Sequence, residues 1–269
     1  MALINLHNHS VYSDGTLKPP ALALEAARAG IKYFSLTDHD TTEGWAEMGP
    51  ALEAAGISYC TGVEISTREY GNLHILGYGL NLSDPGLAAT LAEFRERRAA
   101  RIKKMVERLN GLGIGINFED LKPRGGVSPG RGQVAELLVQ RNLVPDIKEA
   151  FRLYLSPGTA AYEPSSGPTV EEAIRAIKGA DGKAVLAHPG KKGTTPNLAA
   201  LKEAGLGGIE AFYPAHSPED TKKFLALAEK YGLFVTGGCD FHGPPFDRSV
   251  MSGFDCPEEY FSEIRDLFL

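Results

Sequence analysis

At both ends of this chain, short apolar runs rich in β-branched and aromatic residues alternate with helix-like stretches, and this alternation limits the fold more than any other feature. Seven runs are predicted as strands: residues 2–6, 33–37, 62–66, 73–78, 184–187, 208–212 and 234–236. Helix-like stretches separate most of them. Because strand, helix and strand in this order favour parallel βαβ units, we predict an α/β fold built as a distorted, TIM-like barrel.

The alternation stops in the middle of the chain. Residues 85–168 read as mostly helical, with a long helix predicted over 85–110 and a Gly/Pro-rich stretch over 122–132. We therefore predict a mainly helical insertion at residues 85–168 that caps the active site. The α/β body would be discontinuous and would comprise residues 1–84 and 169–269.

Composition narrows the class of protein. The chain is 43% hydrophobic with a formal net charge of −6, which argues against general nonspecific binding to nucleic acid. It begins without a basic segment followed by an apolar one, and it has no apolar run long enough to span a membrane. The three cysteines, Cys60, Cys239 and Cys256, lie far apart and form no CxxC pair. We expect a cytoplasmic protein without disulfides.

The seven histidines are concentrated at predicted strand ends. Five of them lie at or just after the end of a predicted strand, where the loops of a parallel barrel converge. His7 and His9 alternate along an extended segment, so both imidazoles point to the same side. Nearby carboxylates could join them: Asp14, Glu64 and Asp240. Imidazole and carboxylate donors together suit manganese, zinc or iron better than calcium or magnesium.

Each of these residues also has a simpler interpretation. A single histidine at a strand end, such as His74 or His188, is more often a hydrogen-bonded residue than a metal ligand. Asp14 precedes a glycine and could be a turn residue. Because so many donor residues occur in an order consistent with one barrel face, we nevertheless predict a multinuclear metal site.

Six ordered motifs then match a known family. The segments LHNHSVYSDG, LTDHD, GVEIS, HILGYG, AHPG and CDFHG resemble the PHP (polymerase and histidinol phosphatase) superfamily, and the whole chain is similar to its stand-alone phosphoesterases of the TrpH type. The resemblance implies a distorted seven-stranded barrel with two or three divalent ions, of manganese, zinc or iron, at the carboxyl ends of its strands.

The resemblance also implies a ligand set for each ion. The first ion would be held by His7, His9, Glu64 and Asp240. Glu64 would bridge to a second ion, completed by His74 and His188. The third ion would be held by Asp14, His39 and His242. A metal-bound hydroxide would then attack phosphorus without a phosphoenzyme, with these residues at the reaction centre: His7, His9, Glu64, His188 and Asp240.

Basic residues of the insertion indicate where substrate would bind. A basic face is predicted on the long helix from Arg97, Arg101, Lys104 and Arg108. For Arg97, Lys104 and Arg108 the alternative is ion pairing on a solvated helix with Glu93, Glu96 and Glu107. We predict a second anion site from Arg101, Arg131 and His216.

Two positions depart from the pattern of the relatives. Asn5 replaces the usual aspartate before LHxH. This position lies behind the ligands, so metal binding should survive the change. Gln133 stands in GRGQ where relatives often have the histidine of GRPH, and this change could alter substrate preference or rate.

The expected activity is hydrolysis of a phosphate monoester of a small nucleotide, first of all a nucleoside 3′,5′-bisphosphate. The alternatives are a 5′-to-3′ exoribonuclease on short RNA, a histidinol-phosphate-like phosphatase and an inactive nucleotide-binding PHP scaffold. An amidohydrolase barrel is less favoured because no lysine lies at a predicted strand end. We expect a small phosphorylated substrate, no membrane association and no protein partner.

Overall fold

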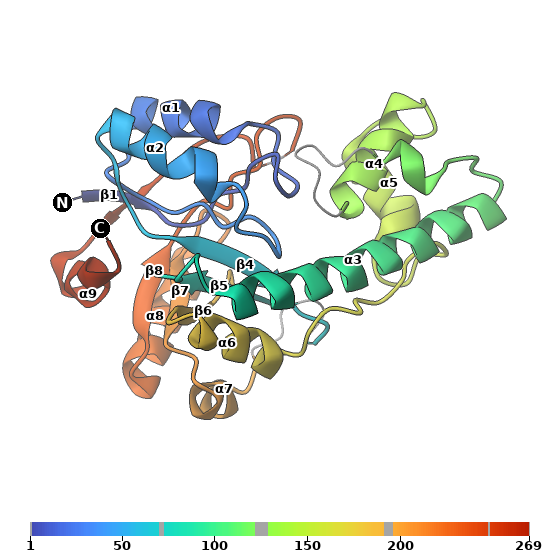
Figure 1. Ribbon diagram of the computed structural model, residues 1–269. Coiled ribbons are helices and arrows are strands. Elements are labelled where there is room, and N and C mark those ends of the chain that lie inside the picture. The colour runs from blue at the N-terminus through green and yellow to red at the C-terminus, as the bar shows by residue number, and fades with distance from the viewer. Residues whose placement is uncertain (1, 70–72, 122–128, 191–195, 247, 269) are drawn as a thin grey trace.

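The computed structural model describes residues 2–69, 73–121, 129–190, 196–246 and 248–268. It has an α/β body and a helical region at the far end of the long helix α3, as Figure 1 shows. Within these ranges no helix combines the length and the apolar character needed to cross a membrane. All three cysteines are buried as free thiols.

The strands of the body form two sheets. The four-stranded sheet has the order β3-β2-β1-β9, with β1 at Ala2–Asn5, β2 at Tyr33–Phe34, β3 at Ser58–Tyr59 and β9 at Phe254–Cys256. The five-stranded sheet has the order β4-β5-β6-β7-β8, with β4 at Gly62–Ser66, β5 at His74–Tyr78, β6 at Lys183–Leu186, β7 at Gly208–Phe212 and β8 at Phe234–Gly237. Two isolated bridges, Asn8 with Phe241 and His39 with Glu64, link one sheet to the other.

The strand pairing corrects part of the predicted fold. The α/β class is confirmed, but the described strands pair as two sheets and not as one closed seven-stranded barrel of parallel units. Strand β5 runs antiparallel to both β4 and β6. The seven residues between β4 and β5 are too few for the helical crossover that parallel neighbours need. The two short strands β3 and β9 carry too little periodicity to be predicted.

Helices cover the sheets of the body. Helices α1 (Pro19–Arg28) and α2 (Trp45–Ala55) share one apolar cluster with Phe34 of β2. Helices α6 (Val170–Gly179), α7 (Leu198–Ala204) and α8 (Pro218–Tyr231) pack on the five-stranded sheet, and α9 (Glu258–Ile264) follows β9. A capping box begins helix α6, because the Glu172 amide donates to Thr169 Oγ1 at 3.0 Å and the Thr169 amide to Glu172 Oε2 at 2.6 Å.

Helix α3 (Pro85–Gly111) connects the body to the helical region. Its amino-terminal half contributes Leu87, Leu91 and Phe94 to the core of the body. Its carboxyl-terminal half contributes Met105 and Leu109, among others, to a second apolar cluster. Because one rigid helix belongs to both cores, it fixes the position of the helical region beside the body (Figure 1).

The second cluster is completed by the shorter helical segments of the insertion. These are η1 (Phe118–Asp120), α4 (Arg131–Gln140), α5 (Ile147–Ala150) and the π-helical turn η2 (Phe151–Leu155). Buried residues of α4, including Val134 and Leu138, belong to this cluster. Of the predicted Gly/Pro-rich stretch at 122–132, residues 122–128 lie outside the described residues.

Candidate metal centre

The loop after β1 brings two histidines together, as the HxH spacing predicts. His7 and His9 are fully buried, and their ring centroids lie 5.3 Å apart. The Nε2 atom of each ring lies 3.1 Å from Oε2 of Glu64 in β4. Asp240, just after β8, places Oδ1 3.4 Å from His7 Nε2 and 3.2 Å from His9 Nε2. Four ligand atoms, from the loops after β1 and β8 and from β4 itself, thus lie within 4.8 Å of one another.

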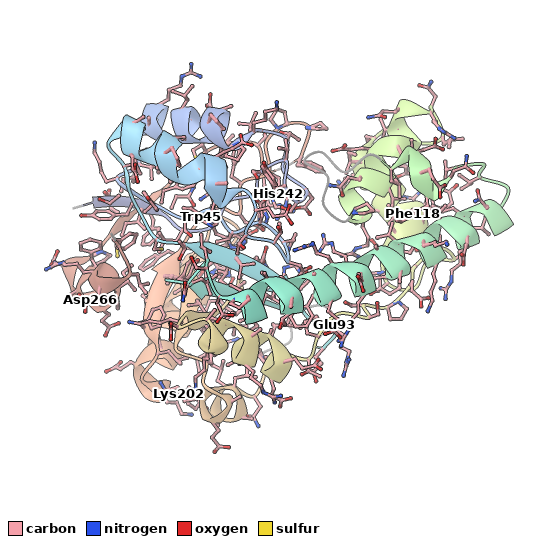
Figure 2. All side chains as sticks on the ribbon, in the orientation of Figure 1. Trp45, Glu93, Phe118, Lys202, His242 and Asp266 are labelled. Atoms are coloured by element: carbon pink, nitrogen blue, oxygen red, sulfur yellow. The ribbon has the colours of Figure 1, made fainter. Side chains whose placement is uncertain are left out.

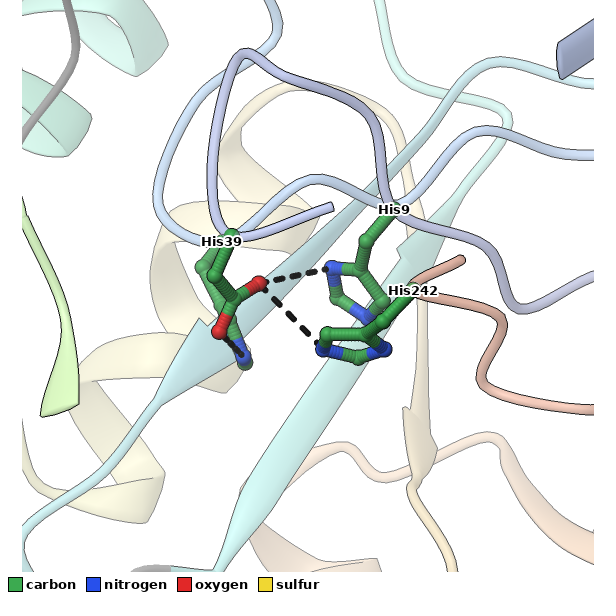
Figure 3. A group of neighbouring side chains, drawn as sticks. His9, His39 and His242 are labelled. Carbon is green, nitrogen blue, oxygen red and sulfur yellow. Dashed lines mark ion pairs between the residues drawn. The ribbon is translucent and has the colours of Figure 1, made fainter. Parts of the chain in front are cut away.

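A second group forms around the carboxylate of Asp14. Its Oδ1 lies 3.6 Å from His9 Nδ1 and 3.3 Å from His242 Nε2, and its Oδ2 lies 3.8 Å from His39 Nε2. Figure 3 shows how His9, His39 and His242 converge. The structure therefore brings together the predicted trio of Asp14, His39 and His242, and adds His9, which belongs to both groups.

Glu64 connects these groups to a third. Its Oε2 faces His7 and His9, and also lies 3.4 Å from His39 Nδ1. Its Oε1 lies 2.7 Å from His74 Nδ1 and 3.1 Å from His188 Nε2. One carboxylate thus stands between two sets of imidazoles, which is the arrangement that a bridging ligand requires.

The backbone around these groups is strained at several positions. Asp40, His188 and Asp240 have positive φ values of 54°, 28° and 53°, although none is a glycine. Such conformations cost on the order of 1–3 kcal/mol each and concentrate at functional sites. Gly15, in the turn after Asp14, permits a close approach, because a Cβ there would lie 2.3 Å from the His9 carbonyl oxygen.

The unsatisfied ligand atoms fit divalent cations. Among the described residues, several buried side-chain atoms of the cluster have no hydrogen-bond partner: His7 Nε2, His9 Nε2, Asp14 Oδ1, Glu64 Oε2 and His242 Nε2. Burying so many polar atoms without partners is costly. These atoms face one another at separations that leave room for ions, and their mixed nitrogen and oxygen chemistry suits manganese, zinc or iron.

The charges of the cluster shift its pKa values in opposite directions. Burial opposes protonation of His7 and His9, but the surrounding carboxylates outweigh it, so the pKa of His7 is raised well above its ordinary value and that of His9 to about 9. Burial, together with the Arg248 charge, lowers the pKa of His242 to about 4. Burial opposes ionisation of Glu64, yet the neighbouring imidazoles hold its pKa well below the usual range. The cluster therefore holds negative charge that a metal ion would neutralise.

Several residues that support the ligands were missed by the sequence analysis. Oδ2 of Asp240 is contacted by the Arg248 guanidinium and accepts a hydrogen bond from the Tyr213 hydroxyl at 3.3 Å. Glu210 of β7 is fully buried beside His7 and His188. A carboxylate inside an otherwise apolar predicted strand was a usable signal for Glu210. No local pattern marks Arg248.

Asn5 lies behind the ligands, where the sequence placed it. Its Oδ1 accepts hydrogen bonds from the backbone amides of His7 at 3.3 Å and Cys239 at 3.1 Å, and its Nδ2 donates to Asn8 Oδ1 at 2.7 Å. An amide side chain performs these tasks without adding a charge. Asn5 therefore supports the loop geometry and does not reach the ligand groups.

A cavity of about 250 Å³ opens above the ligand residues. Its floor includes Asp14, His39, Glu64, His74, His188 and His242, and its walls include Arg98, Arg101, Arg131, Arg248, Phe151 and Phe246. His242 lies on the side of the body that faces the insertion (Figure 2). The cavity therefore combines a floor of ligand residues from the body with cationic side chains, most of them from the insertion.

Arg101 and Arg131 both line this cavity, as predicted for an anion site. Arg101 donates from Nε to the Glu163 carbonyl oxygen at 2.9 Å and packs over the Tyr162 ring. Burial and the neighbouring Arg131 charge lower the pKa of Arg101 to about 10, which still leaves it protonated at neutral pH. Two cations that line the same cavity favour an anion between them.

The other cations of the predicted basic face do not line the cavity. Arg97 pairs with Glu93, while Lys104 and Arg108 both pair with Glu163. All three residues therefore form ion pairs, and Arg97 does so with a predicted partner. For Lys104 and Arg108, however, the partner comes from across the insertion and not from the same helix.

Arg98 was missed and contacts the body directly. It donates from Nη1 to Ser66 Oγ at 2.9 Å, and its Nη2 lies 3.8 Å from Asp14 Oδ2. The neighbouring Arg95 donates to the Asp40 carbonyl oxygen at 3.0 Å. Helix α3 therefore contacts the ligand loops through Arg95 and Arg98. Neither arginine was singled out from the sequence.

The predicted substrate residue His216 and the divergent residue Gln133 both lie outside the lining of the cavity. His216 places Nδ1 2.9 Å from the Ala211 carbonyl oxygen and packs its ring 4.8 Å from that of Phe224, so the structure does not bring it beside Arg101 and Arg131. Gln133 is buried, donates to the Ser13 carbonyl oxygen at 2.8 Å and accepts from the Gly130 amide at 2.7 Å. Gln133 therefore links α4 to the turn that contains Asp14 by a hydrogen bond.

Comparison with known proteins places this site in context. The model of the PHP domain family matches residues 5–112. A 3′,5′-nucleoside bisphosphate phosphatase from Chromobacterium violaceum is 37% identical, over 91% of this chain and 88% of that protein. The 5′-3′ exoribonuclease Rnm from Escherichia coli is 32% identical, over 90% of this chain and 86% of that protein. The structure of a C. violaceum amidohydrolase with bound sulfate and no metal superimposes with a TM-score of 0.89 at 34% identity, over 100% of this chain and 98% of that one.

Proposed function

The chain belongs to the PHP family, and from this premise we propose that it is a metal-dependent phosphoesterase that removes the 3′-phosphate of a nucleoside 3′,5′-bisphosphate. The observation that carries the proposal is a cluster of buried imidazole and carboxylate atoms beneath a cavity with arginine-lined walls. The relative named for this activity covers nearly all of the chain, which supports the same choice of substrate.

The ligand residues divide into three sets. His7, His9, Glu64 and Asp240 would hold one ion, and Asp14, His39 and His242, joined by His9, would hold another. Glu64 would connect the first ion to a further position beside His74 and His188. We propose two or three divalent ions, of manganese, zinc or iron. Bound ions of this kind lower the pKa of a water ligand to about 7 and stabilise the charge that develops on a phosphoryl group.

The arginines would bind the second phosphate. Arg101 and Arg131 line the same cavity as the ligand residues, and guanidinium groups match phosphate oxygens in pairs. A substrate with two phosphates could then place one at the ligand groups and the other at these arginines. His216, which lies outside the lining, is not part of this proposal.

The architecture supports a division of tasks. We propose that residues 1–84 and 169–269 form one metal-binding body, and that residues 85–168 are an insertion that caps its active site. We further interpret the two sheets as halves of a distorted barrel, because bridges at Asn8 and His39 join them on either side of the ligand loops.

A second candidate is 5′-to-3′ exonucleolytic cleavage of short RNA. The relative named for that activity is 32% identical over 90% of this chain. Hydrolysis of a phosphodiester would use the same floor and the same arginines, so the products distinguish the two reactions. The bisphosphate substrate yields inorganic phosphate, whereas RNA yields mononucleotides.

The test is phosphate release by manganese-reconstituted protein from a panel containing nucleoside 3′,5′-bisphosphates, histidinol phosphate and short 5′-phosphorylated RNA. Asp240→Ala and His188→Ala would be measured beside it, with Arg152→Ala on the outer face of the insertion as a matched control. The proposal expects fast phosphate release from the bisphosphate, lost in both ligand variants and retained in the control. Mononucleotides from RNA with no phosphate from any monoester would establish the second candidate instead.

A further inference from the structure

Glu210 is a buried carboxylate that the ligand assignments leave unexplained. It lies in β7, the strand between β6 and β8 of the five-stranded sheet, and it is fully buried. Desolvating an ionised carboxylate costs several kcal/mol unless hydrogen bonds compensate for the lost water. Its contacts therefore indicate what this charge does inside the protein.

Among the described residues, the hydrogen-bond contacts of the Glu210 side chain lead to two proposed metal ligands, His7 and His188. Its Oε1 lies 3.0 Å from Nδ1 of His7, and its Oε2 accepts a hydrogen bond from the backbone amide of His188 at 2.7 Å. The opposite nitrogen of His7, Nε2, faces Glu64 at 3.1 Å. With Nε2 aimed at the ligand group, Nδ1 carries the hydrogen and donates it to Glu210.

The contact to His188 acts on the backbone. His188 has a φ of 28°, a left-handed conformation that a side chain other than glycine adopts only under restraint. The hydrogen bond to Glu210 holds the His188 amide in this conformation, which directs its ring toward Oε1 of Glu64. A single carboxylate thus orients one ligand through its ring and another through its main chain.

We propose that Glu210 is a positioning residue that couples two metal positions, by fixing the His7 tautomer at the first and the His188 backbone at the second. The proposal rests on the metal centre of the proposed function. Hydrogen bonds from a ligating histidine to a carboxylate orient the ring and increase its basicity, and losing one costs 10- to 100-fold in metal affinity. Because Glu210 serves two ligands, its loss should weaken more than one ion.

The test is titration of the metal-free protein with Mn²⁺ by calorimetry, without substrate, comparing Glu210→Gln with Glu203→Gln on the exposed face of α7. Glutamine keeps the size of the side chain, but its amide nitrogen must face one of the two N–H donors. We expect the dissociation constant for Mn²⁺ to rise about 10- to 100-fold in Glu210→Gln at more than one binding step, and to stay within about twofold in Glu203→Gln. Activity of Glu210→Gln should return when Mn²⁺ is raised above the new dissociation constant.

Unchanged Mn²⁺ affinity in a folded Glu210→Gln protein would overturn the proposal, as would an activity defect that no concentration of Mn²⁺ restores. If Glu210→Gln fails to fold, Glu210→Asp takes its place, because it keeps the charge but shortens the reach to both partners. Wild-type affinity in Glu210→Asp would also refute the coupling. Wild-type protein that binds Mn²⁺ but hydrolyses no phosphate ester would refute the proposed function alone, since this titration uses no substrate.

Discussion

The floor and the walls of the cavity are built in different ways. The floor consists of ligands from the strands and loops of the body, each held by several buried contacts, such as Glu64 among five histidines. The walls carry arginines from α3 and α4 that are held by carbonyl oxygens and aromatic rings. A buried network with many partners tolerates little change, whereas side chains held by fewer contacts can be exchanged more easily. Under the proposed function, the floor would carry out the chemistry and the walls would select which phosphate ester is accepted.

The largest effect on activity is expected from removing a ligand that two groups share. His9 belongs to the groups around both Asp240 and Asp14, whereas His74 lies at the edge of one. We expect His9→Ala to lower kcat/KM on the order of 1000-fold, because metal stabilisation of the transition state is worth several kcal/mol. His74→Ala should lose less activity and fewer bound ions. Metal content by mass spectrometry and phosphate release would be measured together. Equal losses in the two variants would contradict the shared role of His9.

The affinity of the metal-free floor for Mn²⁺ should depend on pH, whereas the charge of the walls should not. Ligand histidines must lose their protons to bind a metal, and the pKa of His9 is raised to about 9 by the surrounding carboxylates against the effect of burial. Affinity for Mn²⁺ should therefore rise about 10-fold per pH unit from pH 7 toward pH 9. A flat profile in calorimetric titrations would contradict the pKa shift.

Stability of the metal-free protein should change in the opposite direction. A histidine whose pKa is higher in the folded state than in the unfolded state stabilises the fold fully below its ordinary pKa of about 6.5. That contribution is lost as pH rises through the folded value, which is about 9 for His9. Thermal unfolding in the presence of a chelator should thus occur at lower temperature at pH 9 than at pH 6.5. A higher unfolding temperature at pH 9 would argue against a proton shared within the cluster.

A variant of Arg98 tests whether the floor and the walls act independently, because Arg98 lines the walls and also contacts the floor. It comes from α3 and contacts Ser66 and Asp14 of the body. A hydrogen bond of a charged group is worth roughly 1.5–3 kcal/mol, so Arg98→Ala should weaken Mn²⁺ binding or substrate binding by about 10-fold or more. Arg97→Ala, one residue away and paired with the exposed Glu93, serves as the matched control and should change little. Similar effects in the two variants would show that α3 acts only as a scaffold.

Gln133 should give the smallest effect. It joins α4 to the turn of Asp14 through one hydrogen bond at 2.8 Å, and it lies outside the cavity lining. A neutral hydrogen bond contributes about 0.5–1.5 kcal/mol, so Gln133→Ala should change kcat/KM by about 2- to 10-fold. A loss comparable to that of His9→Ala would mean that Gln133 reaches the substrate.

Prediction from sequence was most successful where local pattern and chemistry coincide. The HxH spacing placed His7 and His9 on one side, and α3 was predicted to within one residue at its carboxyl end. These features depend on periodicity over a few residues. The division of the ligands into sets was predicted through the family resemblance and stays a prediction. In the structure, His9 lies with Asp14, His39 and His242, and His39 also lies with Glu64 and His74.

What could not be predicted depends on contacts between distant segments. Arg248 meets Asp240 through a turn, and Glu210 meets His7 across the two sheets, with no local pattern to mark either pairing. The pairing of strands into two sheets depends on crossover lengths and on the short strand β9, which carries little signal. His216 was associated with the arginines by its motif, but the structure places it against Phe224.

The most direct test of the central claim compares two substrates on one preparation. Manganese-reconstituted protein would be assayed with a nucleoside 3′,5′-bisphosphate and with the matching 3′-monophosphate, in wild type and in the Arg101→Ala/Arg131→Ala double variant, with Arg152→Ala as control. If the walls bind the second phosphate, wild type should prefer the bisphosphate by at least about 100-fold in kcat/KM, and the double variant should bring this ratio close to one without losing its bound metal. A wild type that does not distinguish the two substrates, or a double variant that keeps the preference, would contradict the account.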